Sequence, residues 1–310
     1  MCGVPQGSIL GPLLFLIYIK DLNLVSEKLK SIMFADDTNL FMTGKSLKEV
    51  SKQMNEELVI LSDWFRANLL SLNVKKTSFI IFSNKKNLTT DIFIDKSALS
   101  RQYETKFLGV IITFNLNWKK HTELVASKIS KNIGIISKIR HLLAIGTTRT
   151  IYLTLVEPYI SYCNLIWAQS ESTSALDKIF RIQKKYCRLL TFSSYRSHSN
   201  PIFFKLSILT VYDIYKYQLA LHMYRIMNNM LSHNDHFVFQ TNTRIHNYNT
   251  RHKMDIHQNY CRTRTRQNTL YFQGPKLWNS IPTELKQLST IQIFKRTFKL
   301  HLLNSNFYKT

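Results

Sequence analysis

The sequence has few cysteines, glycines and prolines, and few acidic residues. Its 310 residues include 4 cysteines, 8 glycines and 6 prolines, and 19 acidic residues stand against 42 lysines and arginines. Cys2, Cys163, Cys187 and Cys261 lie far apart and form no C-x-x-C pair. This spacing excludes a dense disulfide framework and argues against a zinc ribbon or knuckle. We therefore expect no zinc, and a reducing, intracellular environment.

Long hydrophobic runs are also lacking. The longest run, residues 9–19, is shorter than the ~20 residues that a membrane-spanning helix needs. No Lys or Arg precedes it and no small-residue cleavage site follows it, so a signal peptide is a poor interpretation. We expect a protein with no membrane partner.

Positive charge is what the sequence has in excess. The formal net charge is +23, while 45% of the residues are hydrophobic and 12% are aromatic. This composition is too apolar for a disordered basic tail. A basic folded protein commonly binds a polyanion, above all nucleic acid, although a merely soluble basic protein remains the alternative. The second half is the more basic, which suggests chemistry in the first half and polyanion binding in the second.

Helices and short strands are both predicted in the first 118 residues. A loop with Gly3, Pro5 and Gly7 leads into an apolar helix over residues 10–20, with Ser8 as its N-cap. The other predicted elements are strands over 31–35, 38–42, 78–82 and 106–114, and an amphipathic helix over 46–70 with Ser46 as N-cap and Glu49 three residues later.

From about residue 119 the pattern predicts mostly helix. A polar, basic connection over 234–275 has no clear periodicity and is predicted to be irregular. The aromatic residues between Tyr212 and Tyr224 are expected to be core. The predicted helices cover residues 121–143, 148–167 (kinked or split at Pro158), 175–191, 211–230 and 290–303.

Asp36-Asp37 is the sharpest chemical feature. The pair separates two short apolar strands, as in a hairpin with a two-residue turn. Adjacent carboxylates there offer hard oxygen ligands to Mg²⁺. Two such ions about 3.5–4 Å apart can activate a hydroxyl and stabilise a leaving pyrophosphate. By itself, a solvated turn is the commoner explanation of two adjacent aspartates.

The surrounding motifs resemble those of the reverse transcriptases of LINE-type (non-LTR) retrotransposons, particularly jockey-like elements. Four segments occur in the family's order: G-V-P-Q-G-S-x-L-G-P-L-L-F from Gly3, Phe34-Ala-Asp-Asp, Asn73-x-x-Lys76-Thr77, and Lys106-Phe-Leu-Gly-Val. Weaker likeness continues through Leu155-Val-Glu-Pro-Tyr-Ile-Ser-Tyr162 with Trp167, and through Gly274-Pro-Lys-Leu-Trp278-Asn-Ser-Ile-Pro282. The likeness therefore covers nearly the whole chain.

The resemblance implies a fold and a reaction. The expected fold is α+β, a partial polymerase palm of short antiparallel strands plus helices, followed by a mainly helical thumb and C-terminal region. The expected domains are a truncated palm (1–118), a thumb-like region (119–233) and a basic C-terminal region with a terminal helix (234–310). The implied reaction is RNA-directed DNA synthesis with Mg²⁺ or Mn²⁺, an RNA template, a DNA primer and dNTPs, with nuclear action.

The resemblance also implies residue roles. Asp36 would be the more committed metal ligand and Asp37 the supporting one. The template and nucleotide side would be formed by Gly3, Pro5, Gln6, Gly7, Ser8, Phe34 and Ala35. Lys76, or its neighbour Lys75, could donate a proton to the leaving pyrophosphate, and a solvated lysine pair is the equal alternative. Phe107, Leu108 and Gly109 would form the primer-facing turn, although for Leu108 we favour a place in the core.

Residues 244–266 interleave arginines with Tyr248, Tyr260 and several histidines. Such a mixture can neutralise phosphates and stack on bases, and a solvated loop is the equal alternative. The histidines His246, His252 and His257 and Cys261 are spaced too loosely to indicate zinc. The predicted nucleic-acid contacts are Arg244, Arg251, Arg262, Arg264 and Arg266.

Two elements of the family pattern have no counterpart in the sequence. These are the strand with a further catalytic aspartate before the glycine loop, and the fingers. We therefore expect a truncated polymerase with little or no activity by itself. The alternatives are a non-catalytic basic module that binds nucleic acid, and a remnant that does not fold stably.

Overall fold

The computed structural model describes residues 4–5, 7–83, 85, 88–169, 173–231, 239–245 and 251–307. The chain forms two compact units. The first consists of residues 1–107 and 112–116, and the second of residues 108–111 and 117–310. Each has its own hydrophobic core. No helix of the described residues is both long enough and apolar enough to cross a membrane.

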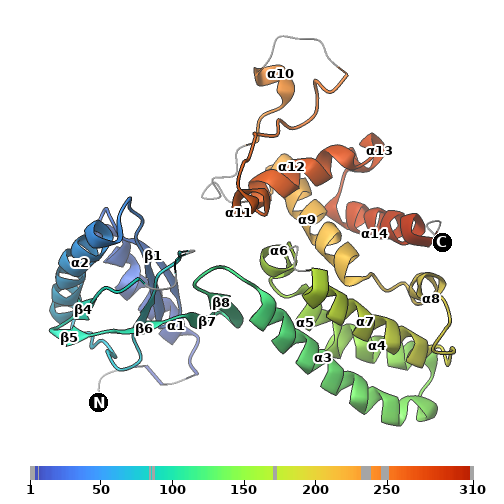
Figure 1. Ribbon diagram of the computed structural model, residues 1–310, viewed down its shortest axis with the longest axis horizontal. Helices are drawn as coiled ribbons and strands as arrows, with labels where there is room; N and C mark the ends of the chain where they lie inside the picture. Colours follow the sequence, from blue (N-terminus) through green and yellow to red (C-terminus); the bar gives the residue numbers. More distant parts are fainter. Residues whose placement is uncertain are drawn as a thin grey trace. The chain divides into compact units, whose positions relative to one another are not determined.

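The first unit combines two long helices with short strands (Figure 1). Its core is formed by the apolar faces of α1 and α2, the inner faces of β1 and β2, and β4. β1 and β2 pair antiparallel, as do β4 and β5. Its elements are α1 (Leu10–Ile19), a 3₁₀ turn η1 (Lys20–Leu24), β1 (Lys30–Phe34), β2 (Asp37–Phe41), α2 (Leu47–Ala67), β3 (Ser78–Ile80), β4 (Phe93–Ile94), β5 (Ser97–Ala98), β6 (Ser100–Gln102) and β7 (Glu104–Phe107).

Local sequence signals explain α2 well. Its N-cap is Ser46, whose hydroxyl accepts a hydrogen bond from the backbone N–H of Glu49 at 3.3 Å. Such a bond satisfies one of the free donors of the first turn. The prediction of this helix and of its cap is confirmed. The predicted N-cap of α1, Ser8, is wrong by one residue, because the helix begins at Leu10 and its N-cap is Ile9. The Oγ of Ser8 still accepts a hydrogen bond from the N–H of Gly11 in the first turn.

One strand pair differs from expectation. β3 pairs with β6 in parallel, whereas only antiparallel strands were predicted. The two strands are separated along the chain by β4 and β5, so they are not the arms of one hairpin. The connection between them is therefore long enough to return the chain in the same direction.

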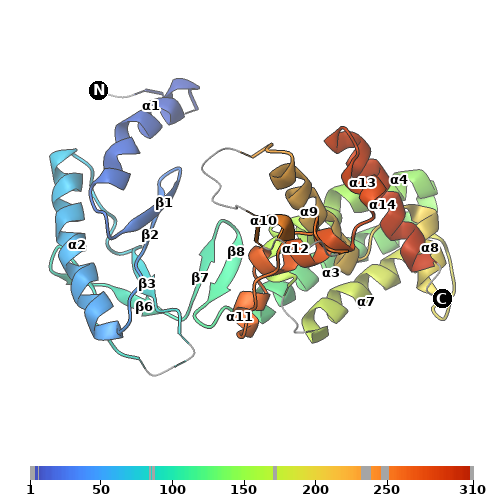
Figure 2. The ribbon, with the colours of Figure 1, turned by 90° about the horizontal axis from the view of Figure 1, so that it is seen from above.

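The second unit is helical. Elements α3 and α7 pack together, as do α9, α12 and α14 (Figures 1 and 2). Its elements are β8 (Val110–Thr113, shared with the first unit), α3 (Lys119–Ile139), η2 (Arg140–Leu142), α4 (Ile145–Leu155), α5 (Glu157–Ser161), α6 (Asn164–Trp167), α7 (Thr173–Leu190), α8 (Ser199–Leu206), α9 (Val211–Met227), α10 (Asn242–Ile245), α11 (Arg264–Gln267), α12 (Leu270–Ser280), α13 (Thr283–Lys286) and α14 (Ile291–Phe307).

Most of the predicted helices of this unit are confirmed. The predicted break near Pro158 is present, because α4 ends at Leu155 and α5 begins at Glu157 with proline in its first turn. Tyr224 is fully buried in the core, as expected. The prediction of an irregular chain up to residue 275 is wrong at its end, where α12 begins at Leu270. The division into 119–233 and 234–310 remains a prediction.

Candidate active site

The candidate metal ligands lie at the tip of the β1–β2 hairpin. The outermost pair of the ladder is Phe34 and Asp37, so the two turn residues are Ala35 and Asp36. The predicted turn, Asp36-Asp37, is therefore wrong by one residue. Each strand has slipped by one position, which leaves every side chain on the same face of the hairpin. For this reason the hydrophobic pattern could not distinguish the two registers.

Ala35 has a left-handed backbone conformation, with φ of 52°. A two-residue hairpin turn needs positive φ at its first central position to match the twist of the strands. Glycine usually takes that position, and alanine there costs about 1–2 kcal/mol. The strain lies directly beside the candidate ligand Asp36, and strained backbone of this kind clusters at functional sites.

Both carboxylates face solvent. Asp36 and Asp37 are exposed, and among the described residues neither forms an ion pair. The burial pattern puts Asp37 on the outer face of the hairpin beside Phe34, while Met33 and Leu40 on the inner face pack against the core. The two carboxylates are thus available to a cation, and no described lysine or arginine competes for them.

The outer face of the hairpin carries Lys30, Asp37 and Asn39, and its other residues are apolar. Phe34, which the resemblance places near the template, is 60% exposed, and Ile32 and Phe41 are exposed with it. Ala35 is exposed too. The side of the hairpin that carries Asp37 therefore offers flat hydrophobic surface next to a carboxylate.

Part of the glycine loop lies within the described residues. Gly7 has φ of 89°, and a Cβ built on it meets no atom within 4 Å. The N–H of Ser8 donates to the carbonyl of Pro5 at 3.1 Å, which closes the turn before α1. Gly7 is thus required by its backbone conformation, and it leaves open space beside it. Gly3 and Gln6 lie outside the described residues.

Lys76 lies in a hydrogen-bonded turn before β3. Its N–H donates to the carbonyl of Asn73 at 3.0 Å, and the Asn73 side-chain oxygen lies 3.3 Å from the same N–H. The side chains of Lys75 and Lys76 are both exposed. Among the described residues, no hydrogen bond or ion pair joins Lys76 to Asp36 or Asp37. Its catalytic role remains a prediction.

The predicted primer-facing turn is a tight hairpin turn between β7 and β8. Leu108 and Gly109 have φ of 44° and 83°. Positive φ at both central residues is typical of a type I′ turn. Leu108 is exposed, so our preference for a core position is wrong. A residue at the tip of such a turn points away from both strands. The sequence pattern predicted one continuous strand over 106–114 and therefore did not indicate a turn at Leu108. Phe107 is the last residue of β7 and is partly buried.

A contact that the sequence analysis missed holds this turn. The hydroxyl of Tyr162 donates to the carbonyl of Leu108 at 2.5 Å, and its ring lies 3.5 Å from the position that a Cβ on Gly109 would take. Tyr162 follows α5 in the chain, 54 residues away. No local pattern could have indicated this pairing, although the family resemblance already drew attention to the segment that contains Tyr162.

The five predicted nucleic-acid contacts are all exposed. Arg244 is on α10, Arg264 and Arg266 are on α11, and Arg251 and Arg262 lie in the connections between helices. Tyr260, at 89% exposure, also projects into solvent. These side chains are accessible to a phosphate backbone. Tyr248 and His246 lie outside the described residues.

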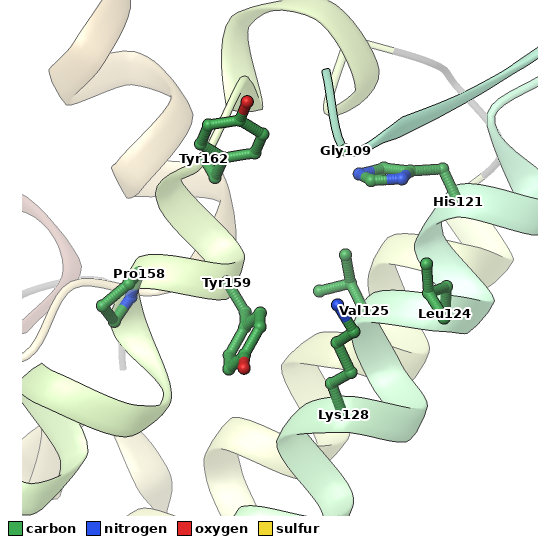
Figure 3. Close-up of a pocket in the computed structure, with 8 residues that line it drawn as sticks. All are labelled: Gly109, His121, Leu124, Val125, Lys128, Pro158, Tyr159 and Tyr162. Atoms are coloured by element: carbon green, nitrogen blue, oxygen red, sulfur yellow. The ribbon is translucent and has the colours of Figure 1, made fainter. Parts of the chain in front are cut away.

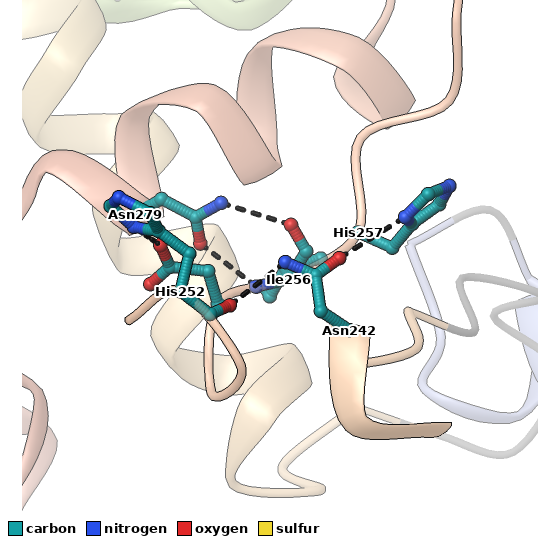
Figure 4. Close-up of polar contacts among 6 residues, drawn as sticks. Asn242, His252, Ile256, His257 and Asn279 are labelled. Atoms are coloured by element: carbon teal, nitrogen blue, oxygen red, sulfur yellow. Dashed lines mark hydrogen bonds and ion pairs between the residues drawn. The ribbon is translucent and has the colours of Figure 1, made fainter. Parts of the chain in front are cut away.

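The histidines of this region form ordinary polar contacts (Figure 4). His252 pairs through Nδ1 with the Asp255 carboxylate at 2.7 Å, and Nδ1 of His257 lies 3.1 Å from Oδ1 of Asn242. Within the described part of the chain, no cluster of three or more His, Cys, Asp or Glu residues could hold a metal ion.

The C-terminal motif around Trp278 has a structural role in this fold. Trp278 is buried against Phe294, and Asn279 binds both backbone groups of Ile256 (Figure 4). The N–H of Ile256 donates to Oδ1 of Asn279 at 3.0 Å, and Nδ2 of Asn279 donates to the Ile256 carbonyl at 2.9 Å. The asparagine thus joins α12 to the segment that carries several of the predicted arginines.

We predict that Asn279→Ala loosens this segment. The substitution removes both partners of the buried Ile256 backbone, and each unsatisfied group costs about 1–3 kcal/mol. Trypsin should therefore cleave the variant faster near Arg244 and Arg251 than it cleaves the unaltered chain. Asn268→Ala, in the same region, is the matched control. Equal cleavage rates of the two variants would contradict the prediction.

Comparison with known proteins supports a polymerase relationship. The sequence model of a family described as "Reverse transcriptase (RNA-dependent DNA polymerase)" matches residues 1–112. No solved structure matches the chain.

Curated relatives come from insect mobile elements. The chain is 27% identical over 219 residues to the probable RNA-directed DNA polymerase from transposon X-element of Drosophila melanogaster, covering 68% of this chain and 24% of that protein. It is 28% identical over 200 residues to the RNA-directed DNA polymerase from mobile element jockey of Drosophila funebris, covering 61% and 22%. For the transposon BS protein of Drosophila melanogaster the identity is 25% over 246 residues, covering 74% and 26%. The chain thus spans about a quarter of the length of these relatives.

Proposed function

We propose that this chain forms part of the RNA-directed DNA polymerase of a jockey-like non-LTR retrotransposon, because residues 1–112 match the sequence model of the reverse transcriptase family. The observation that carries the proposal is the exposed Asp36-Asp37 pair on a strained hairpin tip, within the segment that the family matches. The substrates would be an RNA template, a DNA primer and dNTPs. As part of the same proposal, the polymerase would act in the nucleus.

Asp36 and Asp37 would hold Mg²⁺, with Mn²⁺ as a substitute. Two exposed carboxylates without a cationic partner among the described residues fit a hard cation that keeps several waters or phosphate oxygens. The metal would stabilise negative charge on the transferring phosphate. Since no third acidic, His or Cys ligand clusters with them in the described residues, we expect the 310-residue chain alone to extend a primer little or not at all.

The remaining residues would bind and orient the substrates. The open space beside Gly7 would let the backbone approach a base pair, and Phe34 and Ala35 would flank the same position. The Leu108-Gly109 turn would face the primer end, held by Tyr162. Lys76 would lie near the pyrophosphate. In this proposal the first unit is part of a polymerase palm and the helices after residue 119 are a thumb and a C-terminal region.

The test is a primer-extension assay with a chimeric polymerase. The segment of the jockey polymerase from Drosophila funebris that aligns with this chain would be replaced by the corresponding residues of this chain. We expect the chimera to extend a DNA primer on an RNA template with dNTPs and Mg²⁺. A chimera that folds and binds primer–template, yet does not extend the primer, would overturn the proposal.

The exposed arginines of 244–266 favour a second candidate function, nucleic-acid binding without catalysis. Binding of this kind should survive Asp36→Ala and weaken with salt. On duplex DNA, log K falls by about 0.9 per tenfold rise in salt for each phosphate contact. We therefore predict that replacing Arg264 and Arg266 by Gln makes the slope of log K against log salt shallower by about 1.8, the value for two phosphate contacts. The measurement is a filter-binding titration at several salt concentrations. An unchanged slope would show that these side chains do not contact phosphate.

A further inference from the structure

The second unit contains a pocket that shares Gly109 and Tyr162 with the proposed primer-facing turn, but whose other lining residues have no role in the functions proposed above. Its volume is about 290 Å³, and Figure 3 shows α3 on one side, and α5 with Tyr162, the residue that follows it, on the other. All lining residues belong to the second unit. They are Gly109, His121, Leu124, Val125, Lys128, Pro158, Tyr159 and Tyr162.

Aromatic rings form much of the wall. Tyr159 and Tyr162 remain 39% and 51% exposed although they belong to a unit with a large core. Tyr162 is held at both ends, because its hydroxyl donates to the Leu108 carbonyl and its own carbonyl accepts from Nε1 of the buried Trp167 at 2.8 Å. Its ring is thus fixed at the pocket and still accessible. A rigid, accessible ring is what a stacking ligand requires.

His121 supplies a directional donor. It is 4% exposed, and its Nδ1 accepts a hydrogen bond from the backbone N–H of Ile111 at 3.3 Å. The N–H can only donate, so the neutral ring carries its proton on Nε2. Burial, and then the charge of Lys128, lower the pKa of His121, which keeps the ring neutral near pH 7. Among the described residues, no acceptor is paired with Nε2.

Positive charge lies at the rim. The ammonium of Lys128 lies 5.1 Å from the centre of the Tyr159 ring, which holds the cation beside the pocket. Lys120, Lys131 and Lys138 are exposed on the same helix. They are spaced by nearly whole numbers of helical turns and so form a row along one face of α3. A polyanionic strand could follow this row and reach the pocket.

We propose that this pocket binds one unstacked nucleobase of a single-stranded nucleic acid. Tyr159 and Tyr162 supply the stacking surfaces, His121 donates to a base acceptor, and Lys128 meets the adjoining phosphate. The volume suits a single base better than a whole nucleoside triphosphate, because it lies just below the roughly 300–1,000 Å³ that pockets for drug-sized ligands have. The inference concerns the second unit alone and does not depend on polymerase activity.

The test uses the full chain and a short single-stranded oligonucleotide that carries 2-aminopurine, whose fluorescence reports stacking. Tyr159→Ala is expected to weaken binding roughly 5- to 100-fold, the range for loss of one base–aromatic stack. The matched control is Tyr195→Ala. Tyr195 is also an exposed tyrosine of the second unit, with Arg188 5.7 Å from its ring centre, but it lies outside the pocket. DNA and RNA versions of the probe show which sugar the site accepts.

A second variant guards against misfolding. Leu124→Trp should fill the pocket without removing a charge or a tyrosine, and should abolish the fluorescence change while the melting temperature stays within a few degrees. Loss of the signal in Tyr159→Ala and Leu124→Trp, but not in Tyr195→Ala, would support the proposal. The proposal would be overturned if all three variants bound the oligonucleotide with equal affinity. It would also be overturned if the affinity changed with salt concentration but with none of the three substitutions.

Discussion

Asp36→Asn is expected to reduce RNA-templated primer extension by the chimeric polymerase at least about a hundredfold. The amide has nearly the shape of the carboxylate, so the hairpin should fold as before, but it is a far weaker ligand for Mg²⁺. Bound metal stabilises the charge of the transition state by several kcal/mol, and each 1.36 kcal/mol corresponds to about a tenfold change in rate. The measurement is the initial rate of nucleotide addition at saturating Mg²⁺.

Asp91→Asn is the matched control for this change. Asp91 is an exposed carboxylate of the same unit, and its backbone carbonyl, which accepts a hydrogen bond from Asn55, is unaffected by the substitution. Its extension rate should stay within about twofold of the unaltered chimera. If both variants extended the primer at the rate of the unaltered chimera, the hairpin tip would not be the metal site. Binding of primer–template should be unchanged in both variants.

Trp167→Ala is expected to lower the unfolding free energy of the second unit by about 3–5 kcal/mol, the usual cost of removing a large buried aromatic side chain. Trp167 is fully buried, donates to the Tyr162 carbonyl, and packs edge-on against His121. Its loss would leave a cavity and an unpaired carbonyl. The melting temperature of the second unit, followed by circular dichroism at 222 nm, should fall by roughly 6–20 °C.

The neighbouring residue provides the control for this experiment. Ile166 is on the same short helix but 51% exposed, so Ile166→Ala should change the unfolding free energy by less than about 0.5 kcal/mol. Identical melting curves for Trp167→Ala and Ile166→Ala would show that the tryptophan is not part of the cooperative core. The prediction also links stability to the nucleobase pocket, because Trp167 supports both Tyr162 and His121.

Several parts of the fold follow from interactions between residues that are close together in the sequence. Helix α2 and its Ser46 cap depend on a hydrogen bond between residues three apart and on apolar residues at helical spacing. The break before Pro158 depends on a ring that cannot continue a helix. The order of the motifs, from the glycine loop through Asp36-Asp37 to the Leu108-Gly109 turn, was sufficient to indicate the polymerase family that residues 1–112 match.

Other features depended on which distant segments meet. The register of the β1–β2 hairpin, with Ala35 in the turn, was open because a slip of one residue on each strand leaves every side chain on its face. The apolar side chain of Leu108, in a segment predicted to be one strand, favoured a position in the core. Leu108 is exposed because the chain turns there. The role of Asn279 in holding Ile256 has no local signature either.

The sequence by itself indicated most of the long helices, a hairpin that carries the carboxylates, and a resemblance to one family, because caps, periodicity and motif order are properties of neighbouring residues. Only the tertiary structure decided the turn register and the nucleobase pocket. That pocket joins Gly109, His121 on α3 and Tyr162 after α5, which are far apart along the chain. They meet because the packing of the second unit's core, and not any local preference, brings these elements together.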